Sequence, residues 1–551
     1  MKERLENKYF LPFKNTISIV AHIFTKYRPV FIVTFFLTFL ISFTQSCKEA
    51  KLVSEAEQKP NIIYVLADDL GYGDISSFNE NGQIKTTHID QLASEGIKFT
   101  DAHTSSAVCT PTRYGIITGR YNWRSRLKSG VLTGKSKALI PNSRTTVASM
   151  LKNQGYNTAF IGKWHLGWDW ALKNKDSISG EGWNAKDFSN IDFSKPITNG
   201  PKELGFAYSY GHSGSLDMAP YVYVENGIPT AVPDSVTENK SKYSWWRKGP
   251  TSNDFIHDDV TPNFFRRSFK YITEKAEEDS PFFLYLALPS PHTPILPTEE
   301  WQGKSGLNPY GDFMLMIDAY MGQLTETIKQ AGIEDNTIVI FTSDNGCSPQ
   351  ADYKILEEKN HDPSYVYRGH KADIFEGGHR VPFIVKWPKN ISKGSISNET
   401  ICTTDLMATC AEITDYKLTG NEGEDSFSLL PLFNQTPLNK PFREATIHHS
   451  INGSFAIRKD DWKLIMCAGS GGWSFSKPNN KAVIDTLPKY QLYNLKEDPS
   501  ETNNLIASNV EKVDELKSLL TKYIKEGRST PDEPQKNDAI DGKWKQIEFM
   551  D

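Results

Sequence analysis

The sequence carries little excess charge of either sign. Its 551 residues contain 62 lysines and arginines against 67 aspartates and glutamates, a formal net charge of -5 at pH 7. Proteins whose main partner is nucleic acid usually present a strong basic field, so this balance argues against that class. An anionic substrate would need a local basic pocket instead.

Long apolar runs are scarce as well. The run at 29–44, PVFIVTFFLTFLISFT, is shorter than the roughly 20 residues of a membrane-spanning helix. Lys26 and Arg28 precede it and Cys47 follows Ser46, which is the order of a bacterial lipoprotein signal. We therefore predict a signal over 1–47 with lipidation at Cys47, a linker over 48–60, and export to the periplasm or the outer membrane. A plain signal peptide or an uncleaved anchor is the alternative.

Cysteine is rare, with six in the chain. Cys47 has a predicted role, and Cys109 is discussed below. An exported protein could form disulfides among Cys347, Cys402 and the two remaining cysteines, Cys410 and Cys467. Buried free thiols are an equally good reading, and the sequence cannot pair these residues.

Buried strands alternate with amphipathic helices over most of the chain. Apolar segments at 62–67, 158–161, 282–288 and 337–342 predict strands, and periodic segments at 88–96, 145–154 and 312–330 predict helices. This pattern predicts an α/β fold whose large, mostly parallel sheet is sandwiched by helices. Residues 170–260 lack regular periodicity, which suggests a functional insertion.

The length favours one large domain with a smaller companion. We expect a catalytic domain over 61–435. After it, hairpin-like runs and a helix near 508–525 predict a smaller C-terminal α+β domain over 436–530, followed by a tail over 531–551. No internal repeat is evident.

Polar residues follow four of the predicted strands. Asp68 and Asp69 end the first, the segment from Lys163 to His165 ends the second, and His292 and Asp344 follow the other two. Ligands of open α/β sheets bind beyond the carboxyl ends of the strands, so these side chains should converge on one crevice.

Asp68, Asp69, Asp344 and Asn345 offer three carboxylates and one amide oxygen. Such a hard-oxygen set suits Ca²⁺ or Mg²⁺, whereas zinc would favour histidine or cysteine. Helix caps and turns are the plain alternative for each pair taken alone.

Cys109 begins the segment CTPTR, which runs into a predicted helix. The position places its side chain at a helix N-terminus, where free N–H groups favour anions. Arg113 lies about one turn further and can point back to the same site. A cysteine here could otherwise be a small packed residue or an ordinary thiol nucleophile.

The CTPTR segment, continuing to Gly119 and Arg120, resembles the signature of the type I sulfatases. The resemblance extends through NIIYVLADDLGYGD, GKWHLG, PHTP, FTSDNG and KADIFEGGHRVP over roughly residues 60–390, and YNLKEDPSETNNL resembles the family's C-terminal domain. It implies an alkaline-phosphatase-like fold, hydrolysis of sulfate monoesters, and oxidation of Cys109 to formylglycine by a maturation enzyme.

Carried over by position, the resemblance implies that one calcium ion is bound by Asp68, Asp69, Asp344 and Asn345 together with an oxygen of the modified Cys109.

The resemblance also implies roles for five further residues. Lys163 and Lys371 would hold sulfate oxygens, Arg113 would orient the formylglycine hydrate, His165 would assist its hydroxyls, and His292 would protonate the leaving oxygen. His212 and His379 lie in plausible rim positions, with substrate contact and plain surface position equally open.

Aromatic rings suit sugars and arginines suit neighbouring anionic groups. Several such residues fall near the predicted site, and core or surface positions are the alternative for each: Trp123, Arg124, Arg126, Trp164, Trp168, Trp170, Tyr221, Tyr223, Trp245, Trp246 and Arg247. We therefore expect a sulfated polysaccharide or oligosaccharide as substrate.

Two rival functions remain open from the sequence. A phosphoester or phosphonate hydrolase of the same fold would release phosphate or phosphonate, although its two-metal members need further Asp and His ligands. A catalytically dead, glycan-binding lipoprotein would bind sulfated glycan without releasing sulfate.

Overall fold

The computed structural model describes residues 58–174, 187–438, 441–538 and 542–550. The predicted signal, Cys47 and nearly all of the 48–60 linker lie outside these residues. The folded unit spans Lys59–Asp551. No helix among the described residues combines the length and apolar character needed to cross a membrane.

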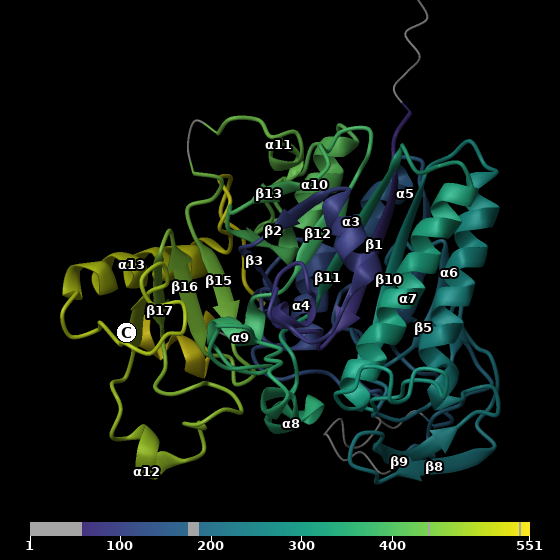
Figure 1. Ribbon diagram of the computed structural model, residues 1–551, viewed down its shortest axis with the longest axis horizontal. Coiled ribbons are helices and arrows are strands. Elements are labelled where there is room, and N and C mark those ends of the chain that lie inside the picture. Colours follow the sequence, from purple (N-terminus) through teal and green to yellow (C-terminus); the bar gives the residue numbers. More distant parts are fainter. Residues whose placement is uncertain (1–57, 175–186, 439–440, 539–541, 551) are drawn as a thin grey trace, which may run out of the picture. The chain divides into compact units, whose positions relative to one another are not determined.

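A ten-stranded, mostly parallel sheet forms the centre of this unit, as predicted (Figure 1). Its five central strands β11, β1, β10, β4 and β5 are parallel to one another. On one side β12 pairs antiparallel with β11, and on the other β6 pairs antiparallel with β5 and β7 with β6. In spatial order the strands are β13 (Ser395–Ser397), β2 (Ile97–Phe99), β12 (Phe383–Lys386), β11 (Thr337–Ser343), β1 (Asn61–Asp68), β10 (Phe282–Pro291), β4 (Asn157–Lys163), β5 (Tyr208–His212), β6 (Val224–Glu225) and β7 (Ile228–Pro229).

Helices cover both faces of the sheet because each central strand is apolar on both sides. Along β1, Tyr64 and Leu66 enter one core with residues of α4 (Cys109–Thr118), α5 (Val147–Asn153), α10 (Leu406–Ile413) and α11 (Leu430–Phe433). Ile63 and Val65 enter the other core with residues of α3 (Thr87–Ser94), α6 (Val260–Ala276), α7 (Pro309–Gln330) and α8 (Tyr353–Glu358). The helix predicted over 312–330 is α7, which starts earlier because the Asn308 side chain accepts hydrogen bonds from two N–H groups of its first turn.

Residues 170–260 contain more regular structure than the sequence predicted. β5 extends the main sheet, and β8 (Ser235–Asn239) pairs with β9 (Trp246–Thr251). The strand at 208–212 was not predicted, because YSYGH lacks the apolar run of the other central strands. Gly211 allows its close packing: a Cβ there would meet the Gly162 carbonyl at 1.8 Å.

The C-terminal part contains the predicted hairpin and helix. β15 (Thr446–His449), β16 (Phe455–Lys459), β17 (Trp462–Ile465) and β18 (Gln491–Asn494) form an antiparallel sheet, and α13 (Val510–Glu526) packs on it (Figure 1). The short α12 (Lys481–Ile484) precedes β18. Phe549 lies buried in the same core, so part of the segment expected to be a tail is packed. The domain border at residue 435 stays a prediction.

Two smaller features complete the fold. β3 (Ala102–His103) pairs with β14 (Ile401–Cys402), and α9 (Glu376–His379) is a single turn. The cysteines in the described part of the chain are Cys109, Cys347, Cys402, Cys410 and Cys467, all free. Of the two readings left open by the sequence, free thiols are therefore correct.

Replacement of Ile63 by alanine should lower the free energy of unfolding by about 2–5 kcal/mol, because the side chain is fully buried in the central strand and would leave a cavity. Ile396→Ala on the edge strand β13 is the matched control, since Ile396 is 60% exposed, and should change stability by less than about 0.5 kcal/mol. Urea unfolding followed by tryptophan fluorescence measures both. Equal effects would contradict this packing.

Candidate active site

The predicted site residues meet at the carboxyl ends of the parallel strands. Asp68 ends β1, Lys163 ends β4, and His292 and Asp344 follow β10 and β11. These four strands are neighbours in the order β11-β1-β10-β4. Four segments far apart in the chain therefore deliver their polar side chains to one place, as the sequence predicted.

Four oxygen-bearing residues form the floor of this site. Asp68, Asp69, Asp344 and Asn345 are each at most 1% exposed. Among the described residues, Asp68 Oδ1 and Asn345 Oδ1 have no hydrogen-bond partner, which is costly for buried oxygens. One atom each of Asp68, Asp344 and Cys109 lies within 4.8 Å of the others. The donor set and its unsatisfied oxygens fit a divalent cation.

Three basic side chains face the carboxylates. Lys371 Nζ lies 2.7 Å from Asp69 Oδ1, Lys163 Nζ pairs with Asp68, and Arg113 donates to Asp344 Oδ2 at 2.9 Å. Arg113 also donates to the Lys163 carbonyl at 2.9 Å. It therefore ties helix α4 to the ends of β11 and β4.

The carboxylates differ in their hold on a proton. Burial would raise the pKa of Asp68, but Lys163, His292 and Arg113 hold it well below its usual range. Burial and the charge of Asp68 instead raise the pKa of Asp344 to about 7, against the opposing effect of Arg113. A proton on Asp344 would relieve this crowding of like charge, and a bound cation would relieve it in the same way.

Cys109 is the first residue of α4, and no side chain caps that helix end. Burial raises the pKa of its thiol to about 11, despite the nearby charges of Lys163 and Lys371. A thiol of this kind stays protonated at neutral pH and is a weak nucleophile. The unmodified residue is therefore poorly suited to the ordinary thiolate role that the sequence left open.

A cavity of about 360 Å³ opens over the site. Cys109, His165, His292 and Lys371 line it. His165 is fully buried: its Nε2 lies 2.8 Å from the Leu132 carbonyl, and its Nδ1 has no partner among the residues described.

The cavity also contains residues that the sequence analysis missed: Ser215, Asp217, Met218, Gln350 and Trp473. Ser215 Oγ lies 3.2 Å from Lys163 Nζ and 3.3 Å from His292 Nε2, so it joins two of the predicted residues. Its position just after β5 was the available signal, but that strand was not predicted. Trp473 comes from the C-terminal part, and no local pattern identified it.

Most of the expected rim residues are elsewhere. Trp245 and Arg247 line the cavity, whereas the buried core holds Trp123, Trp164, Trp168, Trp170, Tyr221 and Tyr223. Arg124 forms a buried ion pair with Asp425, Arg126 bonds to the Lys137 carbonyl, and Trp246 stacks on His257. Aromatic side chains supply large apolar area, so a cluster of them in the sequence is explained as well by packing.

His212 and His379 are also not at the rim. His212 is 2% exposed and stacks on Phe264, and His379 is fully buried beside two other histidines.

Comparison with known proteins agrees with this geometry. The family model described as Sulfatase matches residues 60–416, and the model described as N-sulphoglucosamine sulphohydrolase, C-terminal, matches residues 370–530. The N-acetylgalactosamine-6-O-sulfatase of Bacteroides thetaiotaomicron is 34% identical over 508 residues, covering 84% of this chain and 93% of the relative. Human arylsulfatase A is 29% identical over 462 residues, 81% of this chain and 83% of its own.

Solved structures give the same picture. A sulfatase from work on glycosaminoglycan metabolism by Bacteroides thetaiotaomicron superposes with a TM-score of 0.73 at 31% identity, covering 85% of this chain and 99% of that one. A more distant structure, bound to its substrate D-glucosamine-2-N,6-O-disulfate, shares the fold at a TM-score of 0.56 and 19% identity, over 85% of this chain and 98% of its own. The chain belongs to the sulfatase family and hydrolyses sulfate esters.

Proposed function

We propose that this sulfatase removes sulfate from a sulfated carbohydrate, using a formylglycine formed from Cys109 and a calcium ion bound beside it. The observation that carries the proposal is the meeting of three kinds of group at the carboxyl end of the sheet. Unsatisfied oxygens of Asp68 and Asn345 suit a cation, two lysines suit an anion, and Cys109 lies close to Asp68 at a helix N-terminus.

Asp68, Asp69, Asp344 and Asn345 would hold the calcium ion, with an oxygen at position 109. Oxygen-only donors favour Ca²⁺ or Mg²⁺ over zinc. When bound, such an ion neutralises negative charge on the sulfate and on the attacking oxygen. Arg113, fixed by Asp344 and the Lys163 carbonyl, keeps position 109 aligned with these ligands.

The sequence CTPTR supports the conversion of Cys109 to formylglycine. A formylglycine hydrate supplies two hydroxyls on one carbon, one to accept sulfate and one to allow its expulsion. His165 lines the same cavity, and its Nδ1 has no hydrogen-bond partner among the described residues. This nitrogen is positioned to hydrogen-bond to such a hydroxyl.

Lys163 and Lys371 would bind the sulfate oxygens. Both ammonium groups now face carboxylates, and a cation among those carboxylates would leave the lysine charges available to the substrate. Each charge-assisted hydrogen bond contributes about 1.5–3 kcal/mol.

His292 would protonate the leaving oxygen. Burial and the charge of Lys371 lower its pKa, and the negative charge of a bound sulfate ester would oppose this effect.

The residues that line the cavity favour a sugar as the group that carries the sulfate. Trp245 and Trp473 offer aromatic faces, and Asp217 with Arg247 offers a charged pair that can hydrogen-bond to sugar hydroxyls. The 34% identical relative is named for 6-sulfated N-acetylgalactosamine, which is the first compound to test. We further propose export of the protein, attachment of a lipid at Cys47, and maturation by a formylglycine-generating enzyme.

Cys109→Ser should fold but lose turnover, because one hydroxyl can accept sulfate yet has no partner on the same carbon to expel it. Sulfated protein should accumulate and be visible by intact-mass analysis. Wild-type protein should show the mass of an aldehyde in place of the thiol. Full activity in protein that carries only unmodified cysteine would contradict the formylglycine.

Asp344→Ala, or exhaustive chelation of calcium, should abolish activity. The variant lacks one ligand of the ion, and chelation removes the ion and leaves the carboxylates crowded. Sulfate release and calcium content are measured together, and added calcium should restore the chelated wild type but not the variant. Unchanged rates after chelation, or recovery with zinc alone, would contradict the calcium assignment.

His292→Ala should impair hydrolysis of a sulfated sugar far more than that of nitrophenyl sulfate. A sugar alkoxide is a poor leaving group and needs a positioned proton, worth about 10²- to 10⁴-fold, whereas nitrophenolate leaves without one. Lys163→Ala is the control, because it removes sulfate binding common to both substrates and should lower both kcat/KM values by similar factors. Equal losses for His292→Ala would assign it to sulfate binding instead.

A further inference from the structure

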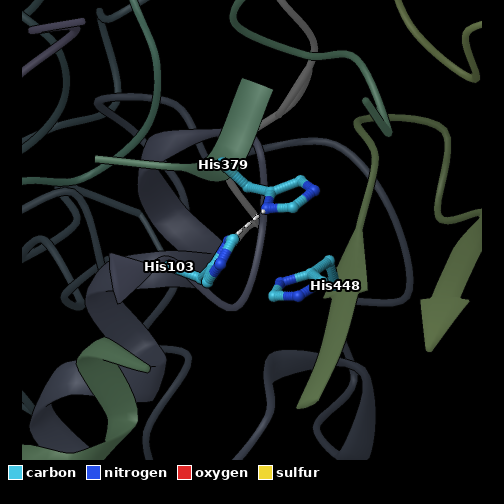
Figure 2. Close-up of side chains that lie close together, drawn as sticks. All are labelled: His103, His379 and His448. Carbon is cyan, nitrogen blue, oxygen red and sulfur yellow. Dashed lines mark hydrogen bonds between the residues drawn. The ribbon is translucent and has the colours of Figure 1, made fainter. Parts of the chain in front are cut away.

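A second cluster of metal-ligating side chains lies outside the active site (Figure 2). His103 ends β3, His379 ends α9 and His448 lies in β15. All three are fully buried, and one nitrogen of each lies within 4.8 Å of the others. The sulfatase reaction described above uses none of them.

One nitrogen of each histidine, called the inner nitrogen below, is close enough to the other two to share an ion: His103 Nδ1, His379 Nδ1 and His448 Nε2. His103 Nδ1 and His379 Nδ1 are hydrogen-bonded to each other at 3.1 Å (Figure 2). Two nitrogens on a tetrahedral zinc ion are about 3.3 Å apart, so an ion could take the place of the shared proton. His448 Nε2 is buried and has no hydrogen-bond partner within the described part of the chain. An unpartnered buried ring nitrogen is costly, and a metal ion would satisfy it.

The second ring nitrogen of each histidine lies within hydrogen-bond distance of an oxygen acceptor. His103 Nε2 lies 2.8 Å from Asp101 Oδ1, His379 Nε2 lies 3.2 Å from the Ile374 carbonyl, and His448 Nδ1 lies 3.1 Å from the Thr104 carbonyl. Metal-bound histidines almost always donate their second N–H to a carboxylate or a backbone carbonyl, which fixes the tautomer that leaves the other nitrogen free to ligate.

We propose that His103, His379 and His448 bind a structural Zn²⁺ ion through His103 Nδ1, His379 Nδ1 and His448 Nε2. Three imidazoles suit zinc rather than calcium, and water can take the fourth position. The rings of His379 and His448 are stacked with centroids 3.9 Å apart, so they must tilt apart for both nitrogens to point at the ion.

The charges around the cluster are paired with one another. Arg458, Arg380 and Lys463 lie around the cluster and are matched by three carboxylates, those of Asp101, Glu376 and Glu501. Lys463 Nζ is 3.0 Å from His379 Nε2 and can donate to it when no metal is present. When zinc binds, that nitrogen donates to the Ile374 carbonyl, and Lys463 keeps its two glutamate partners.

The ion would join three segments of the active-site region. His103 precedes Cys109 by six residues, and His379 follows Lys371 by eight. The same segments are already linked by backbone hydrogen bonds, from Thr104 N to the His379 carbonyl at 2.8 Å and from Ala372 N to the Ala107 carbonyl at 2.7 Å. His448 brings the C-terminal sheet to this junction, so zinc would tie that sheet to the segments carrying Cys109 and Lys371.

Zinc content and zinc-dependent stability test the proposal in the full-length protein, dialysed with excess calcium to occupy the oxygen site. Wild type and Asp344→Ala should each retain about one zinc per chain. His448→Gln should bind zinc more than about 100-fold more weakly, since loss of an outer partner alone costs 10- to 100-fold. His449→Gln is the matched control: His449 is buried on the same strand outside the cluster and should leave zinc content unchanged.

Stripped wild-type protein should also gain thermal stability when zinc is added, and His448→Gln should not. Cobalt bound in place of zinc should give the visible absorption of a four-coordinate Co²⁺ ion. The proposal is overturned if stripped wild type neither takes up zinc nor changes its Tm in excess zinc, a result that needs no variant to fold. It is also overturned if His448→Gln retains zinc as well as His449→Gln does. Loss of zinc in Asp344→Ala alone would place the ion at the oxygen site.

Discussion

The active site depends on the balance of buried charge among three carboxylates and three basic side chains. Asp68, Asp69 and Asp344 are removed from water, and Lys163, Lys371 and Arg113 lie against them. None of these charges could stay buried alone, because desolvation of an unpaired ion is prohibitive. The carboxylates and their partners come from different strands and loops, so this balance requires the whole sheet to assemble.

The parallel sheet makes that assembly possible. Its strands β11, β1, β10 and β4 are apolar along their length and polar where they end. Burial of the apolar part fixes the register, and the register fixes the height at which each polar side chain stands. The strands pack most tightly at Gly162, the residue directly before Lys163. Its φ is +133°, and a Cβ there would lie 1.8 Å from the Ala287 carbonyl oxygen.

The C-terminal part contributes to the same region. Trp473 reaches the cavity over Cys109, and His448 packs against His103 and His379. Backbone hydrogen bonds connect Ala107 N to the His449 carbonyl and Ile451 N to the Ala372 carbonyl. The C-terminal part is therefore hydrogen-bonded to the segments that carry Cys109 and Lys371.

The sequence by itself determined the α/β architecture and identified the polar residues that follow the central strands. Apolar strands followed by Asp68, Lys163, His292 or Asp344 are local patterns, and a parallel sheet brings their ends together whatever the details of packing. Only the tertiary structure decided what lies around them. Strand β5, and with it Ser215 and Asp217, carried no apolar run; Trp123, Trp164 and Tyr221 had the same local signal as Trp245 yet pack in the core. Trp473 reaches the active-site cavity, and the three clustered histidines reach one another, through contacts between residues far apart in the sequence. Local periodicity cannot reveal such contacts.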